Sequence, residues 1–158
     1  MLLLCWSPKS GTSRVSRKRL LEIRADAFER RVLCLRGWDQ FAVWGAGRDS
    51  RSFISLLRYD TKLRIVAMLD VDPKKCGKSF FYSKQGSDSI KSIPIMHFTD
   101  FTSSSIASSR AQVARKLERV PVVVCVAKRR KGYGTECELE HNVKMLGLTE
   151  GVNLWYVM

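Results

Sequence analysis

The feature that most constrains the fold is the stretch Phe41–Arg51, in which an apolar run breaks into a glycine turn and then into a helix-compatible segment. This order predicts a β-strand, a glycine loop and a helix that starts near Asp49. Gly45 would allow the tight turn, and Gly47 would let backbone N–H groups approach an anion at the N-terminus of the helix. Ser50 stands where the dinucleotide-binding fingerprint has its third glycine, so the match to that fingerprint is incomplete.

A second apolar run, Ile65–Leu69, follows and ends in Asp70. A run that is apolar throughout is typical of a strand covered on both faces of a parallel sheet. Dinucleotide-binding folds place the acid that holds a ribose hydroxyl at the position of Asp70. The unit of strand, glycine loop, helix, strand and acid therefore indicates an α/β protein.

The sequence predicts a single Rossmann-like three-layer domain with a mostly parallel five-stranded sheet of order 3-2-1-4-5. The further strands are expected at 93–98, 120–126 and 153–157, and the further helices at 110–119 and 135–146. The polar stretches 80–92 and 102–109 are interpreted as loops, the first with at most a short hairpin. Pro94 lacks an N–H donor, which favours the edge of the sheet for the third strand.

Three segments organise the chain. Residues 1–18 are rich in serine and basic side chains and are expected to be poorly ordered, and residues 19–36 are expected to form an amphipathic helix before the Rossmann-like domain at 37–158. The apolar stripe of this helix should pack on the domain that follows, an interpretation favoured over membrane or calmodulin binding; its members are Leu21, Ala25, Phe28, Val32 and Leu35.

Composition narrows the class of protein. The 158 residues, 45% of them hydrophobic, suit one domain, and no apolar run is long enough to predict a transmembrane span. Five cysteines without a Cys-x-x-Cys pair suit reduced thiols, so we expect a cytoplasmic protein. A net charge of +13 fits nucleic acid, an acidic membrane or an anionic small molecule, but no RNA-recognition, zinc-finger or basic-zipper signature supports nucleic acid.

A basic loop follows the strand at 120–126, and it contains Lys128 and Arg129. In a doubly wound sheet of the expected order, this loop and the glycine loop flank the crevice where ligands bind. The sequence therefore predicts a site for a phosphate-bearing ligand, although a solvated surface charge run explains the basic loop equally well. The predicted site residues are Gly45, Ala46, Gly47, Arg48, Asp70, Lys128 and Arg129.

The sequence predicts neither a metal site nor catalytic residues. Asp70-Val71-Asp72 has the form of a metal-binding Asp-x-Asp motif, but here it is the natural end of a strand. Cys137 and His141 lie four residues apart on one expected helix, which is too few ligands for zinc. His97 and His141 fall on different elements, and no nucleophile–base pair stands out.

Five ordered segments, at 41–51, 66–75, 93–98, 122–126 and 150–151, resemble the C-terminal domain of β-1,3-N-acetylglucosaminyltransferase-like proteins. The resemblance covers roughly residues 16–158. In that family this domain follows a family 2 glycosyltransferase domain, which does not precede Gly45 here. The glycine loop and the segment Asp70–Lys75 are also similar to the small domain of bacterial sugar acetyltransferases that cradles a nucleotide sugar. Ser50 departs from both families, which usually carry glycine there.

This resemblance implies an accessory module that binds a nucleotide or nucleotide sugar such as a UDP-sugar, that lacks turnover of its own, and whose partner is a family 2 glycosyltransferase domain. An NAD-dependent oxidoreductase fragment is an alternative, but a redox enzyme needs a substrate site that this chain has no second domain to build. A basic adaptor for protein or nucleic acid is the other alternative. Steep salt dependence of polyanion binding would favour the adaptor.

Overall fold

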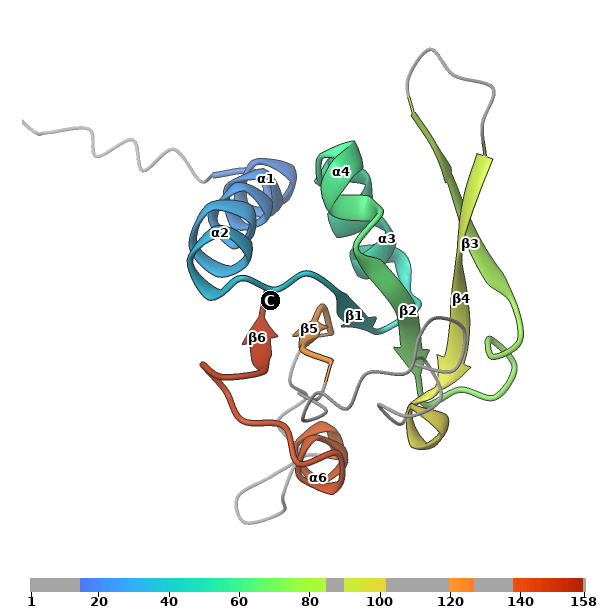
Figure 1. The fold of residues 1–158 in the computed structure, drawn as a ribbon. Coiled ribbons are helices and arrows are strands. Elements are labelled where there is room, and N and C mark those ends of the chain that lie inside the picture. The colour runs from blue at the N-terminus through green and yellow to red at the C-terminus, as the bar shows by residue number, and fades with distance from the viewer. Residues whose placement is uncertain (1–14, 85–89, 102–119, 127–137, 158) are drawn as a thin grey trace, which may run out of the picture.

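In a computed structural model that describes residues 15–84, 90–101, 120–126 and 138–157, the chain forms a six-stranded sheet with helices on both faces (Figure 1). The strand order is β3-β4-β2-β1-β5-β6. All neighbouring strands are parallel except β3 and β4, which are antiparallel. The expected α/β class with a mostly parallel sheet is therefore confirmed. The strands are β1 (Phe41–Trp44), β2 (Ile65–Asp70), β3 (Ser79–Ser83), β4 (Ile90–His97), β5 (Val122–Val124) and β6 (Leu154–Tyr156).

The predicted five-stranded order 3-2-1-4-5 is wrong, because the sheet has a sixth strand, β3, at its edge. Residues 80–92 were expected to be a loop with at most a short hairpin, because serine, glycine and lysine are frequent there, and β3 and β4 do form an antiparallel pair in this region. That expectation gave too little weight to Phe80, Phe81 and Tyr82, aromatic residues that favour strands. Phe80 and Tyr82 alternate with exposed neighbours and pack against the core, which fixes the strand.

Pro94 does not mark the edge of the sheet, because β4 lies between β2 and β3. The missing N–H donor of Pro94 is tolerated because the residues paired with β2 begin one position later, at Ile95. The Ile95 N–H points the other way and donates to the Lys78 carbonyl oxygen at 2.8 Å.

The expected amphipathic helix is present but not regular. It consists of α1 (Arg17–Ala27), a π-helical segment η1 (Phe28–Leu33) and α2 (Cys34–Arg36), and it ends at Gly37, whose φ is +63°. The prediction that Leu35 packs on the sheet is wrong, since this side chain is 80% exposed. In the wider π turns Val32 stays buried as predicted, and its neighbour Leu33 packs inward where Leu35 was expected.

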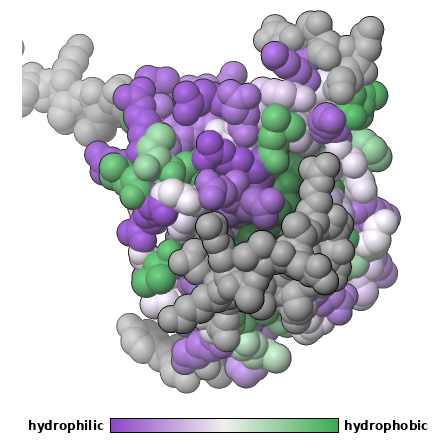
Figure 2. Space-filling model, viewed as in Figure 1, coloured by the Kyte–Doolittle hydropathy of each residue, from purple (hydrophilic) through white to green (hydrophobic). Residues whose placement is uncertain are grey.

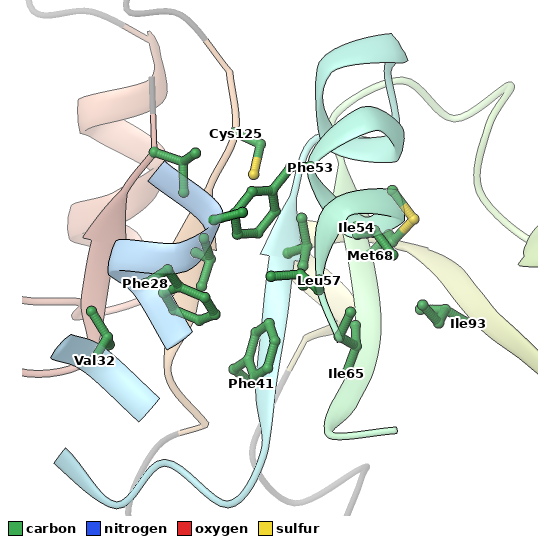
Figure 3. Close-up of a cluster of buried hydrophobic side chains, with 14 of the residues drawn as sticks. Phe28, Val32, Phe41, Phe53, Ile54, Leu57, Ile65, Met68, Ile93 and Cys125 are labelled. Atoms are coloured by element: carbon green, nitrogen blue, oxygen red, sulfur yellow. The ribbon is translucent and has the colours of Figure 1, made fainter. Parts of the chain in front are cut away.

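The helical segment 17–36 covers one face of the sheet together with α3 (Arg48–Leu56) and α4 (Tyr59–Lys62). Phe28, which is fully buried, is the centre of this core (Figure 3). Its ring meets Trp38, Phe41 and Phe53 edge-on, with centroid distances of 6.3, 5.2 and 5.7 Å. Such pairs add to the free energy gained by burial and fix the helix on the sheet.

The opposite face of the sheet is covered by α6 (Glu138–Met145) and the 3₁₀ turn η2 (Phe98–Asp100). Trp44 stacks on Phe98 with a centroid distance of 5.4 Å. The predicted helix at 110–119, the loop at 102–109 and the first residues of the predicted helix at 135–146 lie outside the described residues. Within the described parts of the chain, no helix is long and apolar enough to cross a membrane.

Candidate functional site

The glycine loop follows β1 and a second segment follows β5, and both begin at the carboxyl ends of these parallel, neighbouring strands. Trp44 lies opposite Val124 in parallel register, and the Cys125 N–H donates to the Trp44 carbonyl oxygen at 3.1 Å. The two segments stay in contact as far as Val126, whose side chain packs against Gly45. The expected partners Lys128 and Arg129 follow directly but lie outside the described residues.

Gly45 occupies a backbone conformation and a space that only glycine fits well. Its φ is +104°, and its N–H donates to the Leu69 carbonyl oxygen at 2.7 Å. A Cβ at this position would lie 2.6 Å from Val126 Cγ1 and 2.9 Å from Ser50 Oγ. Gly45 therefore makes the tight turn that joins β1 to α3.

Ser50 fills the position of the missing third glycine. Its side chain is buried under the glycine loop. Ser50 Oγ has no hydrogen bond of ordinary geometry among the described residues, and its one polar interaction there is a weak one with the Cys125 thiol. A buried hydroxyl without a partner costs free energy because its hydration is lost on folding. The serine therefore keeps α3 close to Gly45 at a cost in stability.

The Ser50→Ala variant is expected to raise the free energy of unfolding by about 1 kcal/mol, because it removes the unpaired hydroxyl. Ser55→Ala in the same helix is the control, since it changes helix propensity equally but removes an exposed hydroxyl that donates to the Arg51 carbonyl oxygen. Urea denaturation of both variants measures the difference. A Ser50→Ala variant less stable than Ser55→Ala would show that the hydroxyl has a partner.

Gly47 has a different role, because nothing in the fold requires it to be glycine. It is the N-cap of α3 with an extended backbone, no side chain caps the helix there, and a Cβ would find nothing within 4 Å. The helix ladder begins with Arg51 N–H bonded to the Gly47 carbonyl oxygen. Among the described residues, the N–H groups of Gly47, Arg48 and Asp49 have no acceptor, so the first turn of α3 presents donors and a partial positive charge to open space.

The Asp70 carboxylate holds the glycine loop in place through a hydrogen bond. One carboxylate oxygen accepts from the Ala46 N–H at 2.7 Å and from Lys75 Nζ at 3.0 Å, and the other accepts from the Asp72 N–H at 3.0 Å. Burial by itself would raise the pKa of Asp70, but these amides and the Lys75 ammonium outweigh it and hold the pKa below its usual value. The carboxylate is therefore charged at neutral pH and committed to the protein's own backbone.

A cleft of about 940 Å³ opens between α1 and the start of α3. Four basic side chains and one acid line it; the lining residues are Arg17, Lys18, Leu21, Ala46, Gly47, Arg48, Asp49, Arg51, Ser52, Ser55 and Leu56. Arg17 Nη2 pairs with Asp49 Oδ1 at 2.7 Å, an exposed ion pair that contributes little to stability. The cleft is therefore positively charged at the end where the donors of α3 lie.

The structure brings together part of the predicted site. Ala46, Gly47 and Arg48 line the cleft, whereas Gly45 and Asp70 lie behind it and shape the loop. Arg17 and Lys18 also line the cleft but were not predicted as site residues, because they fall in a segment that was expected to be poorly ordered. The available signal was Ser16, whose hydroxyl caps α1 by accepting from the Arg19 N–H at 3.2 Å.

The remaining reactive groups do not assemble into further chemistry among the described residues. Burial raises the pKa of the Cys125 thiol, and burial with nearby carboxylates raises that of Cys76, so both are protonated and weakly nucleophilic. His97 Nδ1 is engaged with Thr99 Oγ1 at 2.7 Å. No group of three or more His, Cys, Asp or Glu in the described parts could hold a metal ion.

Comparison with models of known protein families found no match, and comparison with solved structures also found none. The fold and site geometry thus define the protein as a mixed α/β domain with a basic cleft beside a glycine loop.

Proposed function

We propose that this chain is an accessory module that binds a phosphate-bearing ligand, of the nucleotide-sugar type, in the cleft beside its glycine loop. The observation that carries the proposal is the uncapped first turn of α3 at Gly47, which opens into a cleft lined by Arg17, Lys18, Arg48 and Arg51. Unpaired N–H groups at a helix N-terminus form a ready anion site, and nearby cations add to the attraction.

The way the loop is held supports this proposal. Asp70 bonds the Ala46 amide, so Ala46 cannot turn its N–H toward a ligand, whereas the amides of Gly47 and Arg48 remain available. No heavy atom lies within 4 Å of the position that a Cβ at Gly47 would take, which leaves room for a phosphate to approach the backbone closely. The ligand would therefore meet donors that are already in place.

The nature of the ligand beyond its phosphate rests on the family resemblance. The resemblance to the C-terminal domain of β-1,3-N-acetylglucosaminyltransferase-like proteins favours a UDP-sugar, with a family 2 glycosyltransferase domain as partner. An NAD-dependent role is less well supported, because Asp70 already accepts three hydrogen bonds from the protein and has little acceptor capacity left to select a ribose hydroxyl. We propose no turnover by this chain. Thr99, whose hydroxyl lies 2.7 Å from His97 Nδ1, does not line the cleft, and neither does His97.

The first test is a thermal-shift series with UDP, UDP-N-acetylglucosamine, NAD and a short RNA at low and moderate salt. A ligand that binds only the folded chain raises the melting temperature by mass action. We expect both UDP compounds to raise it and NAD to have a smaller effect. A shift by RNA alone that disappears steeply with salt would support the basic-adaptor alternative instead.

Gly47→Asp tests the site itself. A carboxylate at the N-cap accepts from the first turn of α3, so stability should change by less than about 1 kcal/mol, while the same charge occupies the position proposed for the phosphate. We therefore expect an unchanged or higher melting temperature without ligand and at least tenfold weaker UDP binding by calorimetry.

Gly77→Asp is the charge control, since it adds the same charge outside the cleft at a glycine with nothing within 4 Å of its Cβ position. Its φ of +78° makes this variant less stable, so the comparison is of UDP binding to the folded chain at a temperature where both variants are folded. It should leave UDP binding unchanged. UDP binding that survives Gly47→Asp, or that is absent from the natural chain, would contradict the proposal.

A further inference from the structure

The helical segment 17–36 has a second apolar stripe on the side away from the sheet. Leu20, Ile23 and Leu35 are 39%, 48% and 80% exposed. In a regular α-helix Leu35 would be rotated about a third of a turn from Ile23. The wider turns of η1 reduce this rotation, so that Leu35 comes round to the outer side with Ile23. A helix that is apolar on two sides has more apolar surface than its own domain covers.

Arginines border this outer stripe. The segment 17–36 carries seven Lys and Arg against three Asp and Glu, and one of these acids, Glu29, is buried and bonded to Arg58. Arg24, Arg31 and Arg36 form no ion pair with any described residue. Figure 2 shows hydrophobic surface among hydrophilic residues on the side of the molecule where α1 and α2 lie.

We propose that this outer face binds an anionic membrane surface, with the helix lying flat in the headgroup region. An exposed apolar stripe bordered by basic side chains is the pattern of interfacial helices on acidic lipids. The arginines without ion pairs favour a lipid surface, and one of them, Arg31, lies one turn from Leu35 within the stripe. An arginine there can lay its aliphatic stem along the apolar stripe and extend its guanidinium to lipid phosphates.

This surface is separate from the cleft. Leu20, Ile23, Arg31 and Leu35 are not among the residues that line it. The proposal goes beyond the binding of a nucleotide sugar and can fail or succeed independently of it. It would place the ligand site of the module close to a bilayer surface.

The test is co-sedimentation of the full chain with vesicles of phosphatidylcholine alone and of phosphatidylcholine mixed with phosphatidylserine. We expect binding to the mixed vesicles only. One basic residue near an acidic bilayer changes the partition coefficient about fivefold, so the triple variant Arg24→Gln, Arg31→Gln, Arg36→Gln should bind about a hundredfold more weakly. The charge-matched control replaces three exposed residues of other elements, Lys74→Gln, Lys78→Gln and Lys91→Gln, and should bind nearly as the natural chain does.

A second variant separates insertion from charge alone. Ile23→Ser with Leu35→Ser keeps every charge and removes the exposed apolar side chains, so it should weaken binding at least tenfold. The double variant Met145→Ser with Val152→Ser is its control, since these two apolar residues of other segments are 62% and 65% exposed. Equal losses in the arginine and lysine triple variants, or no loss in the Ile23 and Leu35 variant, would overturn the proposal. Failure to bind either vesicle would also overturn it and would point to an acidic protein surface.

Discussion

Asp70→Asn is expected to lower the free energy of unfolding by about 2–3 kcal/mol at neutral pH. The carboxylate accepts three hydrogen bonds, and an asparagine amide cannot accept them all because its nitrogen is a donor. Lys75 would lose its ion-pair partner, but its side chain is 40% exposed, so water would solvate the ammonium charge and limit the loss of stability. Urea denaturation measures the loss, and amide exchange at Ala46 should accelerate because the loop is no longer braced.

The effect of Asp70→Asn should depend on pH in one direction. The pKa of Asp70 is lowered in the folded chain, so the stabilising contribution of its charged form is fully present above the unfolded value of about 4. That contribution is lost as the pH falls through the lower folded value. The natural chain and the variant should therefore converge in stability in strong acid.

Asp72→Asn provides the control for this comparison. Asp72 lies on the same turn, but its carboxylate accepts only the Lys74 N–H among the described residues and its side chain is only partly buried. We expect a loss below about 1 kcal/mol. Equal losses in the two variants would mean that Asp70 does not brace the loop.

Gly45→Ala should destabilise the chain by about 3–5 kcal/mol. A side chain at a φ of +104° costs about 1–3 kcal/mol in backbone strain, and a Cβ 2.6 Å from Val126 Cγ1 adds an overlap of similar cost. For a chain of this length the melting temperature should fall by about 10 °C.

Two further variants isolate the causes of this loss. Gly77→Ala has a positive φ of 78° but nothing within 4 Å of its Cβ, so it should show the strain without the overlap. Val126→Ala removes the overlapping Cγ1 and should restore part of the stability lost in Gly45→Ala, as a double-mutant cycle would show. Additive losses would contradict the contact between the glycine loop and the chain after β5.

The centre of the fold could be predicted from sequence because several local signals agree there. Two apolar runs with glycines between them predict a strand, a tight turn, a helix and a second strand. The structure confirms this order in β1, the glycine loop, α3 and β2. The sixth strand escaped prediction because β3 is short and lies between polar segments, while its aromatic residues are only half-buried. Local composition does not register a strand that depends on pairing with β4.

The candidate site was predicted less completely than the fold. Leu35 was misplaced because a π-helical turn changes the helical period, and nothing local in residues 28–33 announces it. Asp70 was expected to contact a ligand, which stays a prediction; in the structure one of its oxygens accepts from Ala46 and Lys75, and the other accepts from Asp72. The sequence predicts that a carboxylate follows the second strand, but the hydrogen-bond donors of this carboxylate depend on distances between residues that are far apart in the sequence.

Because Asp70 holds the glycine loop in one conformation, it would affect both the rate of ligand association and the entropy lost on binding. A loop that is ordered before a ligand arrives loses little conformational entropy on binding, so little of the interaction energy is consumed in fixing it. Association would not wait for a rearrangement of the backbone. Selectivity would then come from the walls of the cleft, where Ser52, Ser55 and Leu56 lie beyond the charged end, rather than from closure of the loop.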